Sequence, residues 1–199
     1  ARRLAKWLQD NGNDGLVLAG TTGESSTLTD DEKLSLFDTV VKAVTIPVIA
    51  GTGSNDTAHS VHLTKEASKL GVAGILAVCP YYNRPSQAGI EAHIRAMSAA
   101  TTLPVVVYDI PVRTGRKIST TTLATLANEV KNVVGVKDAA GNPGESARLM
   151  TMTPSSFELI SGDDGLTLPL MAVGCTAVIG VATHWTGVDH QEMFAKWNA

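Results

Sequence analysis

Short apolar runs recur along the chain and give the first indication of its fold. They occupy residues 15–20, 46–51, 74–79, 104–109, 133–138, 157–162 and 176–182. None of them alternates apolar with polar residues, and continuous apolar runs are typical of parallel strands that are covered on both faces. The pattern therefore predicts seven buried strands in one parallel sheet.

Helical patterns lie between the predicted strands. Thr29 and Glu32 have the spacing of a capping box, in which the side chain of each residue bonds the backbone N–H of the other. Ser86 and Ser119 are placed to cap two further helices. The apolar positions behind the first cap follow a helical period, at Leu34, Phe37, Val40, Val41 and Val44. The sequence therefore alternates strands with helices, as a chain of βαβ units does.

Seven strand–helix units fit two α/β architectures, a (β/α)8 TIM barrel and a doubly wound sheet. Residues 51–56, GTGSND, hold only two of the three glycines of a dinucleotide-binding fingerprint, so the evidence for the sheet is weak. The barrel fits the strand count better, although such barrels usually need about 250 residues. We expect one barrel domain over residues 1–199 that is incomplete, without its first strand and its C-terminal helices.

Composition and charge narrow the function classes. The chain is 44% hydrophobic and 18% charged, with a net charge of −3, and it contains no basic run. Nucleic acid and anionic membranes are therefore not expected as partners. No apolar run is long enough to span a bilayer, and the first residues lack the apolar segment of a signal peptide. Cys79 and Cys175 have apolar neighbours, which favours buried thiols in a reducing cytoplasm.

The residues that follow each predicted strand are the candidates for chemistry, because the active site of a (β/α)8 barrel lies at the C-terminal ends of its strands. They are mostly hydroxyl groups, glycines and a few charged side chains: Thr21, Thr22, Thr52, Gly53, Tyr81, Tyr82, Tyr108, Asp109, Arg113, Lys137, Asp138, Gly162, Asp163, Asp164 and Ile179. Lys137 is the unusual member, because it ends an apolar strand and lysine is rarely fully buried.

A simple ion pair does not explain the lysine. Asp138 follows Lys137 directly, and successive side chains of a strand point to opposite faces of the sheet. A buried amine is instead a candidate nucleophile that forms a Schiff base with a carbonyl compound. Catalysis needs an amine pKa of roughly 7 to 8, against about 10.4 in water, and burial supplies shifts of that size. Tyrosine and threonine hydroxyls are suited to moving the protons of such a reaction.

Six segments together resemble the dihydrodipicolinate synthase (4-hydroxy-tetrahydrodipicolinate synthase) family. In chain order they are GTTGES at 20–25, VIAGTGSN at 48–55, PYYNRPSQ at 80–87, YDIPVRTG at 108–115, GVKDAAGN at 135–142 and SGDDG at 161–165. The resemblance implies a lyase that condenses pyruvate with aspartate semialdehyde in the diaminopimelate and lysine pathway. It also implies no metal, no organic cofactor, and a homo-oligomer, either a tight dimer or a tetramer made of two such dimers.

The resemblance implies four catalytic residues. Lys137 matches the lysine that forms the Schiff base with pyruvate. Tyr108, Thr21 and Tyr82 match the proton-relay triad of the family. Tyr82 matches the member that a neighbouring subunit usually contributes.

Four further residues match substrate-binding positions. Thr22 matches the contact to the pyruvate carboxylate, and Arg113 matches the contact to the carboxylate of the semialdehyde. Gly162 and Ile179 match backbone positions that line the pyruvate pocket. Other activities stay open at this point, namely N-acetylneuraminate lyase, a keto-deoxy-sugar acid aldolase, a phosphate-handling barrel, and a binding barrel that has lost catalysis. Arg113 favours the synthase, because a short aldehyde acid needs a cation where a sugar chain needs hydroxyl partners.

The resemblance also bears on feedback inhibition by lysine, which many relatives bind at a dimer interface. Tyr81 and Asn55 match that site. Asp30 and Lys33 replace two histidines, and His59 replaces the glutamate that receives the amino group of the ligand. Losing the partner of a buried ammonium typically costs several kcal/mol, so we expect weak or absent inhibition by lysine.

Overall fold

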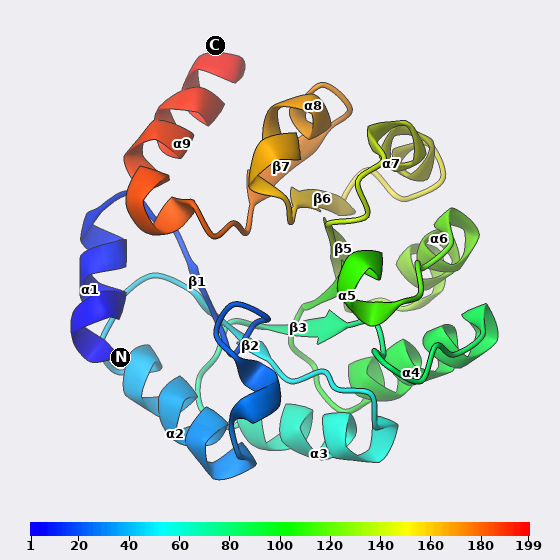
Figure 1. Ribbon diagram of the computed structural model, residues 1–199, viewed down its shortest axis with the longest axis horizontal. Coiled ribbons are helices and arrows are strands. Elements are labelled where there is room, and N and C mark those ends of the chain that lie inside the picture. Colours follow the sequence, from blue (N-terminus) through cyan, green and yellow to red (C-terminus); the bar gives the residue numbers. More distant parts are fainter.

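The computed structural model describes residues 1–199, in which strands and helices alternate along the chain (Figure 1). The strands are β1 (Leu16–Leu18), β2 (Val48–Gly51), β3 (Gly74–Val78), β4 (Val105–Asp109), β5 (Val133–Asp138), β6 (Glu158–Ser161) and β7 (Cys175–Val178). The α-helices are α1 (Arg2–Asp10), α2 (Asp30–Val41), α3 (Thr57–Ala67), α4 (Gln87–Ala99), α5 (Pro111–Thr114), α6 (Thr120–Glu129), α7 (Pro143–Met150), α8 (Thr167–Met171) and α9 (Thr183–Trp197). Two 3₁₀ turns, η1 (Ser25–Thr27) and η2 (Asp164–Leu166), complete the set.

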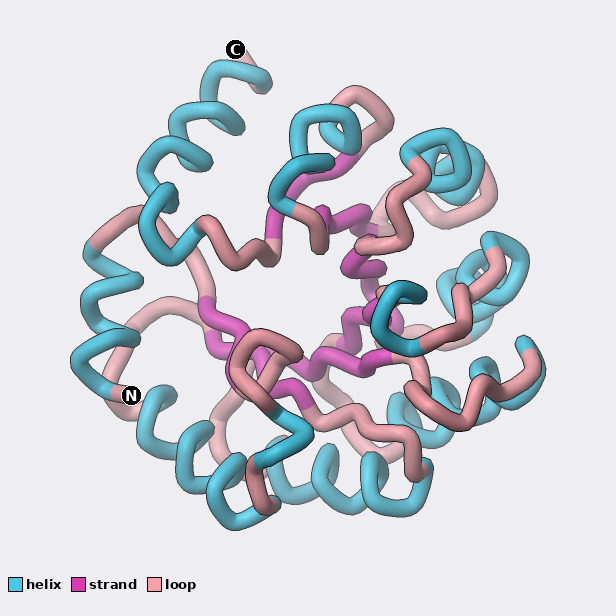
Figure 2. Tube along the Cα trace, in the orientation of Figure 1, coloured by secondary structure: helices cyan, strands magenta, loops and turns pink.

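The seven strands form one parallel sheet in the order β1-β2-β3-β4-β5-β6-β7. Figure 2 shows that the sheet curves around a centre and that the longer helices lie on its outer side. The two edge strands, β1 and β7, do not pair with each other. The predicted fold class is confirmed: the protein has an α/β fold of the (β/α)8 type in which the barrel is not closed.

All seven predicted strands are present, and the first and the last differ most in their bounds. The run at 15–20 gives only the three residues Leu16–Leu18. The apolar run at 176–182 predicts a long strand, but β7 ends at Val178. The reason is a carboxylate from another loop, because Asp164 accepts hydrogen bonds from the backbone N–H groups of Val181 and Ala182. Those donors are therefore bound outside the sheet, just before α9 begins.

The predicted helix caps are confirmed. Thr29 and Glu32 form the reciprocal capping box at the start of α2. Ser86 accepts the backbone N–H of Gly89 at the start of α4, and Ser119 accepts that of Thr122 at the start of α6. Each cap satisfies a backbone donor that has no partner inside its helix.

Side chains pack in two separate apolar clusters, one on each side of the sheet. The larger cluster lies between the strands and the surrounding helices and includes Phe37, Ile75 and Val107. The smaller cluster fills the inside of the curved sheet and consists of Leu76, Val106, Tyr108 and Ile110. Successive residues of one strand, such as Val107 and Tyr108, therefore lie in different apolar clusters. This alternation decides which side chains reach the centre of the barrel.

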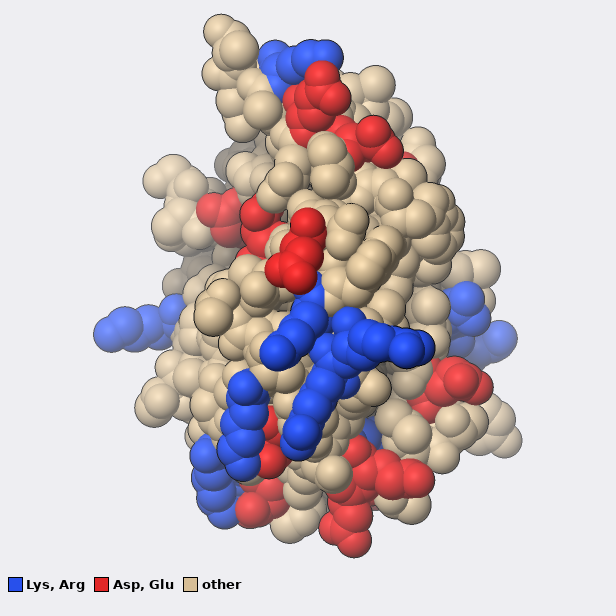
Figure 3. All heavy atoms as spheres, turned by 90° about the vertical axis from the view of Figure 1, so that its left-hand side faces the viewer, with Lys and Arg blue, Asp and Glu red and all other residues tan.

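The surface carries mixed charge. Figure 3 shows the face on the left of Figure 1, where Lys and Arg side chains gather in the middle and Asp and Glu lie above and below them. Helix α1, on that side, contributes Arg2, Arg3 and Lys6. None of the helices combines the length and the apolar character that crossing a membrane requires.

Candidate active site

Lys137 and Tyr108 meet inside the barrel at the ends of neighbouring strands. They are direct partners in the register of β4 and β5, and only 8% and 4% of their respective surfaces are exposed. The Nζ atom of Lys137 lies 4.1 Å from the centre of the Tyr108 ring. The amine therefore sits over an aromatic face, an arrangement that attracts a cation but leaves a neutral amine free to react.

Burial changes the acid–base behaviour of both groups. It lowers the pKa of the Lys137 amine from 10.5 to about 8, and the charge of Asp164 acts in the opposite direction. It raises the pKa of the Tyr108 hydroxyl, while the neighbouring Thr21 hydroxyl and the Arg113 charge act to lower it. A useful fraction of the Lys137 amine is therefore neutral near physiological pH, and Tyr108 keeps its proton.

Gly162 gives the lysine its space. A β-carbon at position 162 would lie 3.0 Å from Cγ and 3.1 Å from Cε of Lys137, closer than side chains normally approach. The backbone N–H of Gly162 donates to the carbonyl oxygen of Asp138, which holds the end of β6 against β5. Ile179 is attached in the same way, since its N–H donates to the carbonyl oxygen of Ser161. The backbone at Gly162 thus borders the Lys137 side chain, and the backbone at Ile179 is bonded to the end of β6.

Thr21 and Thr22 lie in the exposed loop that follows β1. The loop turns tightly, with the N–H of Glu24 bonded to the carbonyl oxygen of Thr21 and Glu24 in the left-handed region at a φ of +54°. The effect of the Thr21 hydroxyl on the pKa of Tyr108 places this loop beside the phenol. Two of the predicted relay residues are therefore adjacent.

Tyr82 is not brought to Lys137 within this chain. Its side chain is 88% exposed, and its backbone has a φ of +69°, which is uncommon for a residue other than glycine. Arg113 is exposed as well, on the short helix α5 that follows β4, where its charge still acts on the Tyr108 hydroxyl. The site therefore has a buried centre at Lys137 and Tyr108 and an open rim that carries Arg113.

Asp164 is a charged neighbour of the site, to which the family resemblance assigned no role. The pair Asp163–Asp164 is expected to form a loop or a helix cap, and Asp163 does cap η2 by accepting the N–H of Gly165. The Asp164 carboxylate instead accepts a hydrogen bond from the backbone of the loop after β7. Its negative charge acts to raise the pKa of Lys137. The position of Asp164 shortly after the end of β6 is the sign in the sequence that it lies near the site.

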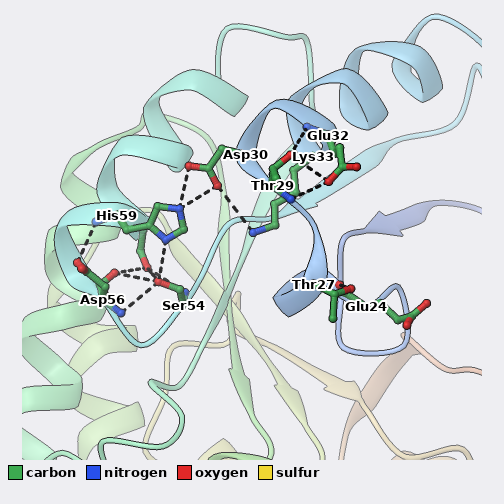
Figure 4. A network of polar contacts seen from close by, with 10 residues as sticks. Glu24, Thr27, Thr29, Asp30, Glu32, Lys33, Ser54, Asp56 and His59 are labelled. Carbon is green, nitrogen blue, oxygen red and sulfur yellow. Dashed lines mark hydrogen bonds and ion pairs between the residues drawn. The ribbon is translucent and has the colours of Figure 1, made fainter.

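The residues that depart from the lysine-binding pattern contact one another (Figure 4). His59 Nε2 lies 2.8 Å from a carboxylate oxygen of Asp30, and Lys33 Nζ lies 3.8 Å from the same carboxylate. Ser54 holds the other ring nitrogen of His59 at 3.2 Å. The three substituted side chains thus form a network of their own between α2 and α3.

Comparison with known proteins places the chain in a family. The sequence profile described as the Dihydrodipicolinate synthetase family matches residues 1–199. The 4-hydroxy-tetrahydrodipicolinate synthase of Moorella thermoacetica is 52% identical over 100% of this chain and 68% of its own length. A dihydrodipicolinate synthase structure from Bacillus anthracis is 45% identical, with a TM-score of 0.96 over 99% of this chain and 68% of that one. A structure of the enzyme from Cyanidioschyzon merolae with lysine bound is also 45% identical, with a TM-score of 0.97 over 98% of this chain and 67% of that one. The chain spans about two thirds of these relatives and belongs to the dihydrodipicolinate synthetase family.

Proposed function

We propose that this chain carries the catalytic barrel of a 4-hydroxy-tetrahydrodipicolinate synthase, the lyase that condenses pyruvate with aspartate semialdehyde. The relatives that bear this name support the activity, at 46% to 52% identity for those from Bacillus subtilis and Moorella thermoacetica. The observation that carries the proposal is the Lys137 amine, which is buried over the Tyr108 ring with a pKa of about 8. The other activities considered from the sequence gain no support of this kind.

Lys137 acts as the nucleophile in this proposal. Its neutral amine attacks the keto carbon of pyruvate, and the carbinolamine that forms loses water to give the imine. Loss of a proton from the pyruvate methyl group then gives an enamine, which attacks the aldehyde of the second substrate and becomes an imine again. The amino group that the second substrate carries then adds to the imine carbon and displaces Lys137, which closes the product ring and returns the free amine. Tyr108 and Thr21 move the protons between these steps, a role supported by the buried phenol and the adjacent hydroxyl.

The remaining residues bind the two substrates. Thr22 and the backbone at Gly162 and Ile179 surround the pyruvate unit, which is supported by the close approach of Gly162 to the Lys137 side chain. Arg113 binds the carboxylate of the semialdehyde at the rim, where its guanidinium is exposed to an arriving anion.

The functional protein is a homo-oligomer in the cytoplasm, with residues 1–199 as part of one barrel domain. The nearly full exposure of Tyr82 supports a second copy, because a relay tyrosine that points away from its own site fits the site of a neighbour. A tight dimer meets this requirement, and two such dimers make the tetramer. The two buried, unpaired cysteines agree with a reducing compartment.

Trapping the imine tests the proposal. Pyruvate followed by borohydride is expected to add one pyruvate-derived group to the protein, and mass spectrometry of a digest is expected to locate it on Lys137. The matched control is Lys131→Ala, which removes an exposed lysine just before β5 and is expected to be labelled like the parent protein. Labelling that persists in Lys137→Ala would show that another amine is the nucleophile.

Arg113→Ala separates the two substrates. This variant is expected to form the pyruvate imine at the parent rate but to show a much higher KM for aspartate semialdehyde. Arg116→Ala is the control, because Arg116 is also exposed and its guanidinium donates to the carbonyl oxygen of Arg84 at 3.3 Å. If Arg113→Ala turns over the semialdehyde normally, the second binding site lies elsewhere.

A further inference from the structure

Two carboxylates lie directly behind the two reactive side chains. Asp109 and Asp138 follow Tyr108 and Lys137 in β4 and β5, and they are partners in the strand register just as Tyr108 and Lys137 are. The alternation of the strands turns them to the outer face of the sheet, as expected for Asp138. Both line one cavity of about 10 Å³, roughly the space of a single water molecule.

The Asp138 carboxylate has the larger number of hydrogen-bond donors of this pair. Its two carboxylate oxygens accept hydrogen bonds from the backbone N–H of Ala140 at 2.8 Å and from the Ser146 hydroxyl at 2.5 Å. Asp109 is only 2% exposed and accepts one hydrogen bond, from the N–H of Ile118 at 3.1 Å. Hydrogen bonds to a carboxylate favour its charged form, and Asp109 has fewer such donors than its neighbour.

The groups around Asp109 do not supply a free positive charge. Lys117, from the segment before α6, is paired with Glu145 of α7. Cys79, from β3, stays a neutral thiol because burial, and then the charge of Asp109, raise its pKa to about 12. Helix α6 lines the cavity with Thr120 and Leu123, neither of which titrates.

The acid–base behaviour of Asp109 agrees with this geometry. Burial raises the pKa of its carboxyl group from 3.8 to about 7, and the charges of Asp138 and Glu145 add to the rise. The Ile118 N–H and the Lys117 charge act in the opposite direction. A neutral carboxyl group has one O–H donor, and the oxygens of Asp138 on the same cavity wall are acceptors.

We propose that Asp109 is a positioning residue that works in its neutral form: protonated beside the Asp138 carboxylate, it keeps the ends of β4 and β5 in the register that brings Tyr108 and Lys137 together. The inference rests on the proposed function, because it concerns the rate at which Lys137 reacts. When Asp109 ionises, two negative charges face each other across neighbouring strand ends, and their repulsion disturbs the two reactive side chains one residue earlier in each strand.

The test compares Asp109→Asn with the parent protein. The amide keeps an oxygen to accept the Ile118 N–H, and it cannot ionise. The rate of imine formation with pyruvate is measured for both proteins from pH 6 to pH 8, and the ratio of variant to parent is taken at each pH. Lys137 titrates in both proteins, so its effect largely cancels. For a group that titrates near pH 7 and reacts only when neutral, the ratio is expected to be about 1.1 at pH 6, about 2 at pH 7 and about 10 at pH 8.

A purely structural role gives a different result. If the ratio changes with pH by less than about 1.5-fold over this range, the ionisation of Asp109 does not control the site and the proposal is wrong. In a second variant, Asp138→Asn, the neighbouring charge is removed, so ionisation of Asp109 no longer creates a repulsion. The ratio of the rate of the double variant Asp109→Asn/Asp138→Asn to that of Asp138→Asn is therefore expected to stay constant from pH 6 to pH 8. If that ratio instead rises with pH as the ratio of Asp109→Asn to the parent protein does, the repulsion is not the cause and the proposal is wrong.

Two further measurements separate this inference from the proposed function. Asp38→Asn removes an exposed carboxylate on α2, where it pairs with Lys42, and is expected to follow the parent protein at every pH. A parent protein that forms no imine at any pH refutes the proposed function. A parent protein that forms the imine while the ratio stays flat refutes the role of Asp109 alone.

Discussion

Replacing Lys137 with methionine is expected to remove activity and to stabilise the fold at the same time. Only 8% of Lys137 is exposed, and its ammonium form lacks a carboxylate at ion-pair distance. The fall of its pKa from 10.5 to about 8 states how strongly the folded protein disfavours that charge. At about 1.4 kcal/mol for each pKa unit, the fall corresponds to roughly 3 kcal/mol.

The sign and the pH range follow from linkage. Between about pH 8 and pH 10.5 the unfolded chain binds a proton at this amine and the folded protein does not, so the free energy of unfolding rises with pH in that window. Below about pH 8 both states are protonated and the folded protein bears the full penalty. Methionine is unbranched and similar in length, so it fills the same space without the charge. Losing the contact with the Tyr108 ring reduces the gain by about 0.5 to 1 kcal/mol.

Urea unfolding at two pH values measures the effect. At pH 7, Lys137→Met is expected to raise the free energy of unfolding by about 2 to 3 kcal/mol, and at pH 10 by no more than about 1 kcal/mol. The control Lys131→Met changes an exposed lysine and is expected to stay within about 0.5 kcal/mol of the parent protein. A Lys137→Met variant that is less stable than the parent, or whose gain is the same at both pH values, would refute the reasoning.

Three further predictions concern the space around Lys137, the rim at Arg113, and the contacts among Asp30, Lys33 and His59. Gly162→Ala is expected to slow imine formation at least about tenfold while the protein stays folded, because the added methyl group meets the Lys137 side chain; stopped-flow measurement with pyruvate checks this. Added salt is expected to raise the KM for aspartate semialdehyde more than the KM for pyruvate, because screening acts on the exposed Arg113; steady-state kinetics at low and at physiological ionic strength check this. Lysine is expected to inhibit only weakly, because His59 and Asp30 bond each other; half-inhibition below the millimolar range would contradict this.

The strands could be predicted from the sequence because their apolar runs are continuous and their ends coincide with polar segments. The position of β7 shows the limit of this reasoning. Residues 179–182 are as apolar as the strand before them. The carboxylate of Asp164, however, binds the N–H groups of Val181 and Ala182, which lie 17 and 18 positions later in the chain. An apolar pattern reports burial, and it does not report which acceptor a backbone N–H finds.

The candidate site could be predicted where the evidence lies in residues that are close together in the sequence. Lys137 was recognisable because an amine at the end of an apolar strand is unusual, and the period of the strand correctly turned Asp138 away from it. The contacts between Asp30 and His59, 29 positions apart, were not predictable in this way. They depend on how α2 packs beside α3, and no local pattern encodes that distance.

Lys137 and Arg113 lie at different depths in the barrel, and this difference fits the order of the two substrates in the proposed reaction. Lys137 is buried and can lose its proton near neutral pH, so it serves a reaction that needs an electron pair. Arg113 is exposed, and a guanidinium stays charged in proteins, so it serves to bind an anion. If the two residues exchanged places, the inner one could not become a nucleophile and the outer one would not be dry enough to become neutral. In the proposed mechanism the first substrate is therefore held at the centre and the second at the rim, which is the order that a condensation through an enamine requires.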